Sequence, residues 1–245
     1  MIEQILTKIA LSSKHHTTIG IDGPTASGKT MLAKHLALML EQTTSTKPQI
    51  FEMDWTLCDR AFREADARKS FETSTPITTE CTSHMILEIA RRVLENTRWR
   101  CADLVLDNLY DRENGQCTKT VFYNGIHDGI SIFEGHYTAH RLFSSYVDVN
   151  ILLLAAPEEL LRRKIERAKT YRDPVLVEKY FYYIDLPSFL TYLEHEVDTR
   201  HDLVFDNTDF RNPVQMDDLG INQWIENADA FYRKQIPNSK RSGSP

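Results

Sequence analysis

Short runs rich in apolar residues recur along the chain. They lie at residues 17–22, 49–53, 129–133, 148–154 and 202–206. Parallel strands that are buried on both faces carry near-continuous apolar runs, so this pattern predicts five buried strands. The stretches between the runs are mostly long enough to hold a helix. The sequence therefore predicts an α/β fold, with a doubly wound parallel sheet and helices on both of its faces.

Between these runs, apolar residues recur every three or four positions, as they do in amphipathic helices. This spacing predicts helices at residues 2–10, 31–41, 78–96, 186–197 and 221–232, and a further helix that begins at Pro157. Residues 98–122 are predicted to form a β-ribbon with a turn at 111–115. Residues 58–76 are expected to be irregular. We expect one domain over residues 1–236, followed by a polar tail at 237–245.

One loop of the predicted sheet has the residues of a phosphate-binding motif. Gly23-Pro24-Thr25-Ala26-Ser27-Gly28-Lys29-Thr30 fills every fixed position of G-x-x-x-x-G-K-[ST], between a predicted strand and a predicted helix. Glycine lets the backbone approach phosphate oxygens, and N–H groups at a helix start point at the anion. Lys29 is expected to contact the β- and γ-phosphates, and the Thr30 hydroxyl to contact Mg²⁺. The motif predicts binding of a nucleoside triphosphate.

Three carboxylates that end apolar runs are candidates for Mg²⁺ binding and catalysis. Asp54 follows the second predicted strand and is expected in the crevice where α/β sheets bind ligands, with a helix cap as the alternative. Glu134 precedes Gly135 and occupies a Walker-B-like position, where a carboxylate helps to hold Mg²⁺. Asp107 is the competing candidate. We prefer Glu134, because the glycine that follows it lets a helix start at once.

Basic residues are concentrated after Pro157. Four arginines occur within eleven residues, namely Arg162, Arg163, Arg167 and Arg172. A charge run of this kind is often only a solvated helix face. Arginine is also the preferred clamp for phosphate, and the chain carries a phosphate-binding motif. We therefore expect an arginine-rich helical lid over about residues 160–180 that closes on the polyphosphate.

Composition limits the classes of function. The 245 residues carry a net charge of −6, which argues against a protein that holds nucleic acid by bulk attraction to phosphate. The four cysteines lie far apart without a C-x-x-C pair, and the N-terminus has no basic export signal. The longest strongly apolar run, 151–156, is too short to span a bilayer. These features predict a cytoplasmic protein without a membrane partner.

In their order and spacing, these residues resemble those of the uridine kinase family of P-loop kinases, in the group that includes phosphoribulokinase and pantothenate kinase. The resemblance runs from about Thr18 to Asp209. It rests on the P-loop, on Asp54 after the second strand, on the Glu134-Gly135 pair, on the lid arginines and on the run at 202–205. The resemblance implies the P-loop kinase fold, with ATP and Mg²⁺ as cofactors.

The resemblance also implies roles for single residues. Lys29 would bind the β- and γ-phosphates, Thr30 and Glu134 would organise Mg²⁺, and Asp54 would act beside the metal as the base towards the acceptor hydroxyl. The lid arginines would hold the transferring phosphoryl group. The assignment is catalytic for Arg163 and Arg167 and nucleotide-binding for Arg162 and Arg172.

The acceptor-recognition residues differ from the family pattern. Uridine kinases carry a tyrosine and a histidine on the ribbon that help to read the pyrimidine, where this chain has Leu106 and Asp111. The leading hypothesis is therefore an ATP-dependent kinase for a small hydroxyl compound, with nucleosides among the candidates. We expect this compound between residues 54–76 and the 98–122 ribbon.

Two alternative functions remain open. Residues 21–29 also look like cytidylate kinase, which favours a nucleoside monophosphate kinase. An acceptor phosphate would then need arginines outside the lid, for which the candidates are Arg91, Arg92, Arg98, Arg100 and Arg112. The second alternative is a non-catalytic nucleotide switch. It is disfavoured, because a switch has little reason to keep Asp54, Glu134 and an arginine lid together.

Overall fold

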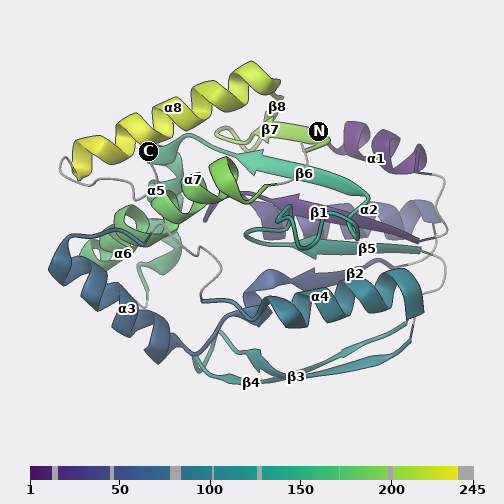
Figure 1. Ribbon diagram of the computed structural model, residues 1–245. Helices are drawn as coiled ribbons and strands as arrows, with labels where there is room; N and C mark the ends of the chain where they lie inside the picture. The colour runs from purple at the N-terminus through teal and green to yellow at the C-terminus, as the bar shows by residue number, and fades with distance from the viewer. Residues whose placement is uncertain are drawn as a thin grey trace.

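A six-stranded sheet with helices on both faces forms the centre of the molecule (Figure 1). The computed structural model describes residues 1–12, 16–44, 47–77, 84–100, 102–125, 129–170, 172–197 and 201–236. The strands are β1 (His16–Asp22), β2 (Gln49–Glu52), β5 (Gly129–Glu134), β6 (Val149–Leu154), β7 (Leu203–Asp206) and β8 (Val214–Gln215). Their order is β2-β5-β1-β6-β7-β8, and all neighbouring pairs are parallel except β7 with β8. The predicted doubly wound parallel sheet is confirmed.

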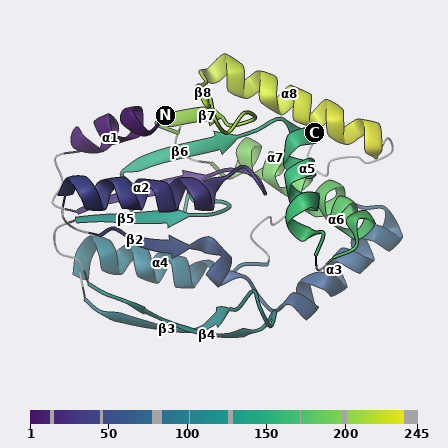
Figure 2. The ribbon, with the colours of Figure 1, turned by 180° about the vertical axis from the view of Figure 1, so that it is seen from behind.

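The central strands are apolar because helices cover both faces of the sheet. Every residue of β1 and β6 is buried. On one face, α1 (Ile2–Ala10) and α2 (Lys29–Thr44) pack with β1, β6 and β7 in one core cluster, as the reverse view shows (Figure 2). On the other face lie α4 (Leu87–Glu95), α7 (Leu186–His195) and α8 (Asp218–Gln235). The alternation of strands and helices thus encodes a three-layer core.

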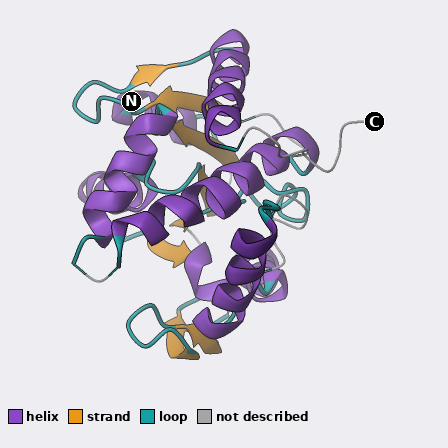
Figure 3. Ribbon diagram, turned by 90° about the vertical axis from the view of Figure 1, so that its left-hand side faces the viewer, coloured by secondary structure: helices purple, strands orange, loops and turns teal. Residues whose placement is uncertain are grey.

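The carboxyl ends of the parallel strands face a group of helices. These are α3 (Arg60–Thr73), α5 (Pro157–Ala168) and α6 (Pro174–Tyr180), followed by the wide turn η3 (Phe181–Asp185). Figure 3 looks onto this end of the molecule and shows these helices in front of the strands. Strand β1 lies between β5 and β6, and its chain continues to the outer strand β2. The end of β1 is therefore a topological switch point, where open α/β sheets bind ligands.

A separate two-stranded ribbon lies below α4 in Figure 1. It consists of β3 (Leu104–Tyr110) and β4 (Cys117–Tyr123), which pair antiparallel. Its inner residues Leu106, Leu109 and Tyr123 pack with Phe51 of β2 and with α4 in one core cluster. The ribbon over about 98–122 is thus present, but the extended part begins only at Leu104, because residues Asn96–Arg100 form a wide helical turn, η2. The apolar inner face ties the ribbon to the sheet.

Two expectations for local structure were wrong. Residues 58–76 are not irregular, because they contain the helix α3, whose few buried residues include Ala67 and Ser70. Its sequence is so polar that no apolar stripe marks it, although alanine, arginine, glutamate and lysine all favour helices. The helix expected at 78–96 is shorter and begins at Leu87, since Leu57 pairs with Met85 and the Ile86 amide bonds to Thr56 O. Residues 78–83 of that expectation, and the tail at 237–245, lie outside the described residues.

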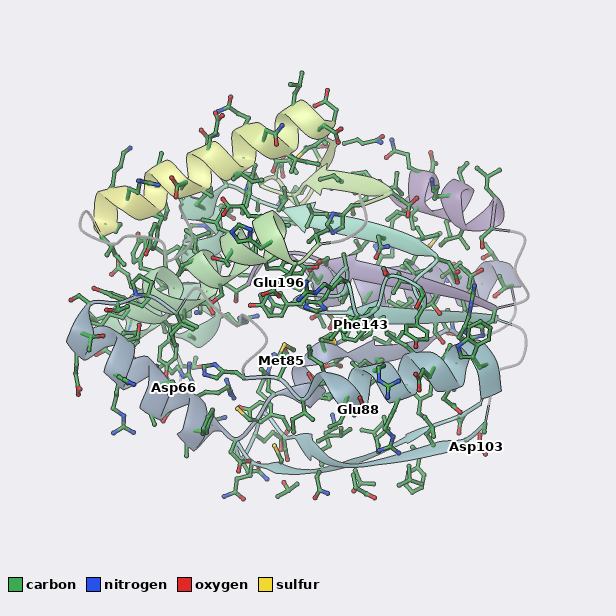
Figure 4. The ribbon with its side chains drawn as sticks, in the orientation of Figure 1. Asp66, Met85, Glu88, Asp103, Phe143 and Glu196 are labelled. Carbon is green, nitrogen blue, oxygen red and sulfur yellow. The ribbon has the colours of Figure 1, made fainter. Side chains whose placement is uncertain are left out.

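Met85 connects two parts of the core. Figure 4 labels it between Asp66 of α3 and Phe143 beside the sheet, and it packs against the core cluster of α4 and the cluster of α7 and α8. Neighbouring His84 bonds to Asp66 at 3.0 Å. These contacts place α3 against the rest of the molecule. No helix among the described residues is long and apolar enough to cross a membrane.

Candidate active site

The P-loop between β1 and α2 has the backbone that its sequence predicts. Gly23 has a φ of +148°, and a Cβ there would lie 2.2 Å from the Leu153 carbonyl oxygen, so only glycine fits. Ala26 and Gly28 also have positive φ values, which turn the loop around the start of α2. Lys29 begins the helix, and its ammonium donates to Pro24 O at 2.8 Å. The motif therefore forms a curved loop with backbone N–H groups at a helix N-terminus, an arrangement that suits a phosphate.

A buried carboxylate below the P-loop fixes its position. Asp22 accepts hydrogen bonds from the Gly23 amide at 2.7 Å, from the Tyr137 amide at 3.1 Å and from the Tyr192 hydroxyl at 2.5 Å. Despite burial, these donors and the nearby His201 hold the pKa of Asp22 below its usual value. Asp22 thus ties the first glycine of the loop to the chain after β5 and to α7. Sequence reasoning read Asp22 only as the end of a strand.

Thr30 and Glu134 meet at the end of β5. The Thr30 hydroxyl donates to Glu134 Oε1 at 2.9 Å. Glu134 is 4% exposed, and this burial raises its pKa to about 7 against the opposing charge of Lys29. For Lys29 the direction is opposite, because burial disfavours its charged form and lowers its pKa. The charges of Glu134, Asp22 and Asp54 oppose this effect. Lys29 and Glu134 are thus buried beside the phosphate loop, while Thr30, whose hydroxyl bonds to Glu134, is exposed.

Gly135 lets the chain pass close to the residue before Asp54. It has a φ of +147°, and a Cβ would lie 2.5 Å from the Cβ of Met53. Asp54 follows Met53 in a short 3₁₀ turn, η1 (Met53–Thr56), directly after β2. Because β2 pairs with β5 so that Glu52 lies opposite Glu134, Asp54 follows two residues later, just beyond the strand beside Glu134, and its charge raises the pKa of Glu134. Asp107, the competing candidate, lies instead on the ribbon, where it accepts a bond from Thr120 at 2.8 Å.

The residues present fit a magnesium ion. Thr30 and Glu134 offer two oxygen ligands that converge, and Asp54 adds a carboxylate nearby. Mg²⁺ is usually held by one or two protein oxygens together with water and substrate phosphates, so no larger cage is needed. The described residues indeed contain no group of three or more His, Cys, Asp or Glu side chains suited to a metal. Thr30 and Glu134 are the groups that would hold the ion.

Of the four arginines expected in the lid, two reach the P-loop side. A cavity of about 640 Å³ beside the loop is lined by Arg163 and Arg167 from α5. Arg163 is held by Glu159 at 2.7 Å and donates to the carbonyl oxygens of Asn207 and Thr208, each at 2.8 Å. Arg167 is exposed, and its charge lowers the pKa of Lys29. Both side chains are therefore placed where they can meet a bound phosphate.

The other two arginines point elsewhere. Arg162 is exposed and pairs with Glu159 at 2.6 Å, which is a surface contact within α5. Arg172 lies 3.7 Å from Glu64 of α3 and above the ring of Tyr180. Neither side chain lines the cavity beside the P-loop. The predicted nucleotide contacts of Arg162 and Arg172 stay a prediction, and in this arrangement Arg172 links the lid region to α3.

Sequence reasoning missed three residues at the site. The side-chain amide of Asn207, directly after β7, donates to the Ser27 carbonyl oxygen of the P-loop at 2.8 Å. Phe210 lines the same cavity and is exposed. His136, two residues after Glu134, has its pKa held well below the usual value by burial and by the charges of Lys29, Lys164, Arg167 and Arg112. A polar or aromatic residue shortly after a strand end was the available signal for all three.

Among the arginines considered for an acceptor phosphate, Arg112 is brought to the site. Arg112, on the turn between β3 and β4, pairs with Asp54. Arg91 pairs with Glu88 and Glu95 on α4, and Arg98 pairs with Asp148 at 3.1 Å. The side chain of Arg100 lies outside the described residues. An ion pair thus joins the ribbon to the carboxylate that follows β2.

Solved structures of several kinases share this fold. A possible uridine kinase from Bacillus stearothermophilus has a TM-score of 0.60 and 20% identity, covering 84% of this chain and 97% of its own. Phosphoribulokinase from Rhodobacter spheroides has a TM-score of 0.56 and 17% identity, covering 79% and 71%. D-glycerate 3-kinase from Cryptococcus neoformans has a TM-score of 0.58 and 13% identity, covering 88% and 99%.

At the level of sequence, no family model matches the chain, and no curated protein is similar to it. The structural likeness covers 84% of the chain in one of these comparisons and 88% in another. The chain therefore has the fold of the uridine kinase-like group of P-loop kinases.

Proposed function

We propose that the protein is an ATP-dependent kinase that transfers the γ-phosphoryl group of Mg·ATP to a hydroxyl of a small molecule. The observation that carries this proposal is the Thr30–Glu134 hydrogen bond beside the P-loop, with Asp54 in the turn directly after the strand that pairs with that of Glu134. A phosphate loop, two magnesium ligands and a further carboxylate are the parts that phosphoryl transfer requires. The structural neighbours, which include kinases named for uridine and D-glycerate, support a small-molecule acceptor.

Each group has a role that follows from its place. The P-loop amides and Lys29 bind the β- and γ-phosphates, and Thr30 and Glu134 would hold Mg²⁺, which would neutralise charge on the phosphates. Arg167 and Arg163 approach from α5 and bind the transferring group, so this helix acts as a lid. Asp54 accepts the proton of the acceptor hydroxyl as its oxygen bonds to phosphorus and the bond to the ADP oxygen breaks.

The cavity beside the P-loop is suited to the nucleoside part of ATP. It extends from Lys29 and Thr30 past Arg163 to Asn207 and Phe210. An exposed aromatic ring can stack on a base, and base–aromatic stacking contributes about 1–3 kcal/mol. The acceptor then binds on the opposite side of the phosphates, where Asp54 pairs with Arg112 of the ribbon turn.

A coupled ADP-release assay tests this proposal. Purified protein with Mg·ATP is given nucleosides, sugars, sugar phosphates and hydroxy acids, and transfer is confirmed by the mass of the phosphorylated product. We expect acceptor-dependent ADP release that disappears in Lys29→Ala. Tight ATP binding without transfer to any compound would instead support a nucleotide switch. Transfer to the phosphate of a nucleoside monophosphate would support the alternative of a monophosphate kinase.

A further inference from the structure

The turn that carries Arg112 is fixed to the start of α3. The Arg60 amide donates to Gly115 O at 2.8 Å, and the Arg60 guanidinium donates to Arg112 O at 2.6 Å. Within the turn, the Gly115 amide bonds to Asp111 O at 2.8 Å. The backbone of Arg112 is therefore held in place from two sides, while its long side chain remains able to change partners.

The side chain of Arg112 reaches the carboxylate that we propose as the base. It pairs with Asp54, although 68% of the Arg112 side chain and 30% of the Asp54 side chain are exposed. Exposed ion pairs of this kind contribute little to stability, since water competes for both charges. A ligand anion that enters this space can therefore replace Asp54 as the partner of the Arg112 guanidinium with little loss of stability. A neutral ligand leaves Arg112 on Asp54, where it competes with the acceptor hydroxyl for the carboxylate.

Several cations lie around the site, and most of them already have partners or proposed roles. Burial and the charges of Lys29, Lys164, Arg167 and Arg112 lower the pKa of His136. Lys164 is compensated by Asp185, and Lys29 and Arg167 serve the ATP phosphates in the proposed function. On α3, Arg63 lies 4.6 Å above the ring of Tyr110 at the end of β3, and Glu64 pairs with Arg172. Arg112 is thus the cation of this group that faces the acceptor side beside the base.

We propose that the phosphoryl acceptor carries an anionic group, a carboxylate or a phosphate, near the reacting hydroxyl, and that Arg112 binds this group and thereby releases Asp54 to the hydroxyl. This inference rests on the proposed function and names its substrate class. The planar guanidinium suits either anion, because its parallel N–H donors match two oxygens. Arg112 is then a specificity-determining residue, and its partner changes from Asp54 to the substrate.

Pairs of acceptors that differ in one charged group test the proposal. The pairs are D-glycerate and glycerol, ribulose 5-phosphate and ribulose, and pantothenate and panthenol. Binding is measured as the rise in melting temperature with Mg·ADP present, and transfer as ADP release with Mg·ATP. The variants are Arg112→Gln, Arg112→Lys and the matched control Arg233→Gln, an exposed arginine that pairs with Asp229 on α8.

We expect the wild type to bind the anionic member of at least one pair more tightly than its neutral twin. Arg112→Gln should reduce this binding by about 10- to 100-fold, the fold-change expected for a hydrogen bond to a charged group. Arg112→Lys should restore part of it, and Arg233→Gln should leave it unchanged. The pair that responds shows whether the anion is a carboxylate or a phosphate.

Other outcomes overturn the inference. In the first, a neutral compound binds or reacts as well as its anionic twin. In the second, no anionic compound binds better than its twin. In the third, Arg112→Gln reduces the binding of both twins equally. These results leave the proposed function intact wherever Mg·ATP still phosphorylates an acceptor. Conversely, if the protein does not bind ATP, the proposed function is wrong, whatever the results for the Arg112 variants.

Discussion

The Thr30 hydroxyl and the Glu134 carboxylate, 104 residues apart in the chain, lie 2.9 Å from one another. Thr30 is placed by the start of α2 and Glu134 by the end of β5. Strand β5 is the direct neighbour of β1, which leads into the P-loop, so parallel pairing brings both side chains to the same edge of the sheet. In the proposed function, this contact would place two oxygen ligands for Mg²⁺ beside the P-loop.

Lys29→Ala is expected to abolish phosphoryl transfer and to weaken ATP binding while the fold is retained. The buried ammonium acts on phosphate charge, and the loss of one such donor typically lowers kcat by about 10²–10³-fold. ADP release and ATP titration measure the two effects. Lys234→Ala, an exposed lysine at the end of α8, is the control. Wild-type turnover by Lys29→Ala would show that the P-loop does not bind the reacting phosphates.

Asp54→Asn is expected to lower kcat by about 10²–10⁴-fold with little change in ATP affinity, because it removes a general base and keeps its shape. Steady-state kinetics with the identified acceptor measures this. Asp107→Asn, on the ribbon, is the matched control and should retain activity. A loss of less than a few-fold would make Asp54 a structural turn residue.

Arg163→Ala combined with Arg167→Ala is expected to leave ATP binding measurable and transfer nearly absent. Arginines that contact a transferring phosphoryl group contribute about 10³–10⁵ in rate. Arg162→Ala, on the same helix but paired at the surface with Glu159, should be close to wild type. If the double variant is as active as Arg162→Ala, the arginines of α5 form only a solvated helix face.

Glu134→Gln is expected to change how stability depends on pH. Burial raises the pKa of this carboxyl from 4.5 to about 7. The native protein therefore favours the protonated carboxyl. The contribution of this preference to the free energy of unfolding is complete below about pH 4.5 and is lost as the pH rises through 7. The glutamine cannot ionise. In the absence of metal, the free energy of unfolding of the variant should therefore rise relative to that of the wild type by about 1–3 kcal/mol between pH 5 and pH 8.

Chemical unfolding at several pH values, with chelator present, measures this difference. Glu226→Gln, an exposed position on α8, serves as the control for the loss of one negative charge. A stability difference between Glu134→Gln and the wild type that does not vary with pH contradicts the assigned burial of Glu134.

The sequence by itself determined the phosphate loop, the parallel sheet and most of the helices. These features depend on local chemistry: glycine at Gly23 where a Cβ would meet the chain, apolar runs where strands are buried, and apolar residues at helical spacing. The helix α3 escaped detection for the same reason. Few of its residues are buried, so its polar sequence carries no stripe that a periodicity could reveal.

Only the tertiary structure decided which of the candidate side chains meet. Glu134 rather than Asp107 lies at Thr30, because β5 pairs with β1 whereas β3 belongs to the ribbon. The same holds for Asn207 at Ser27 and Arg112 at Asp54, pairs brought together by strand order and by the anchoring of the ribbon turn. A sequence states the chemistry of a side chain, but the partner depends on distances that arise when distant segments pack.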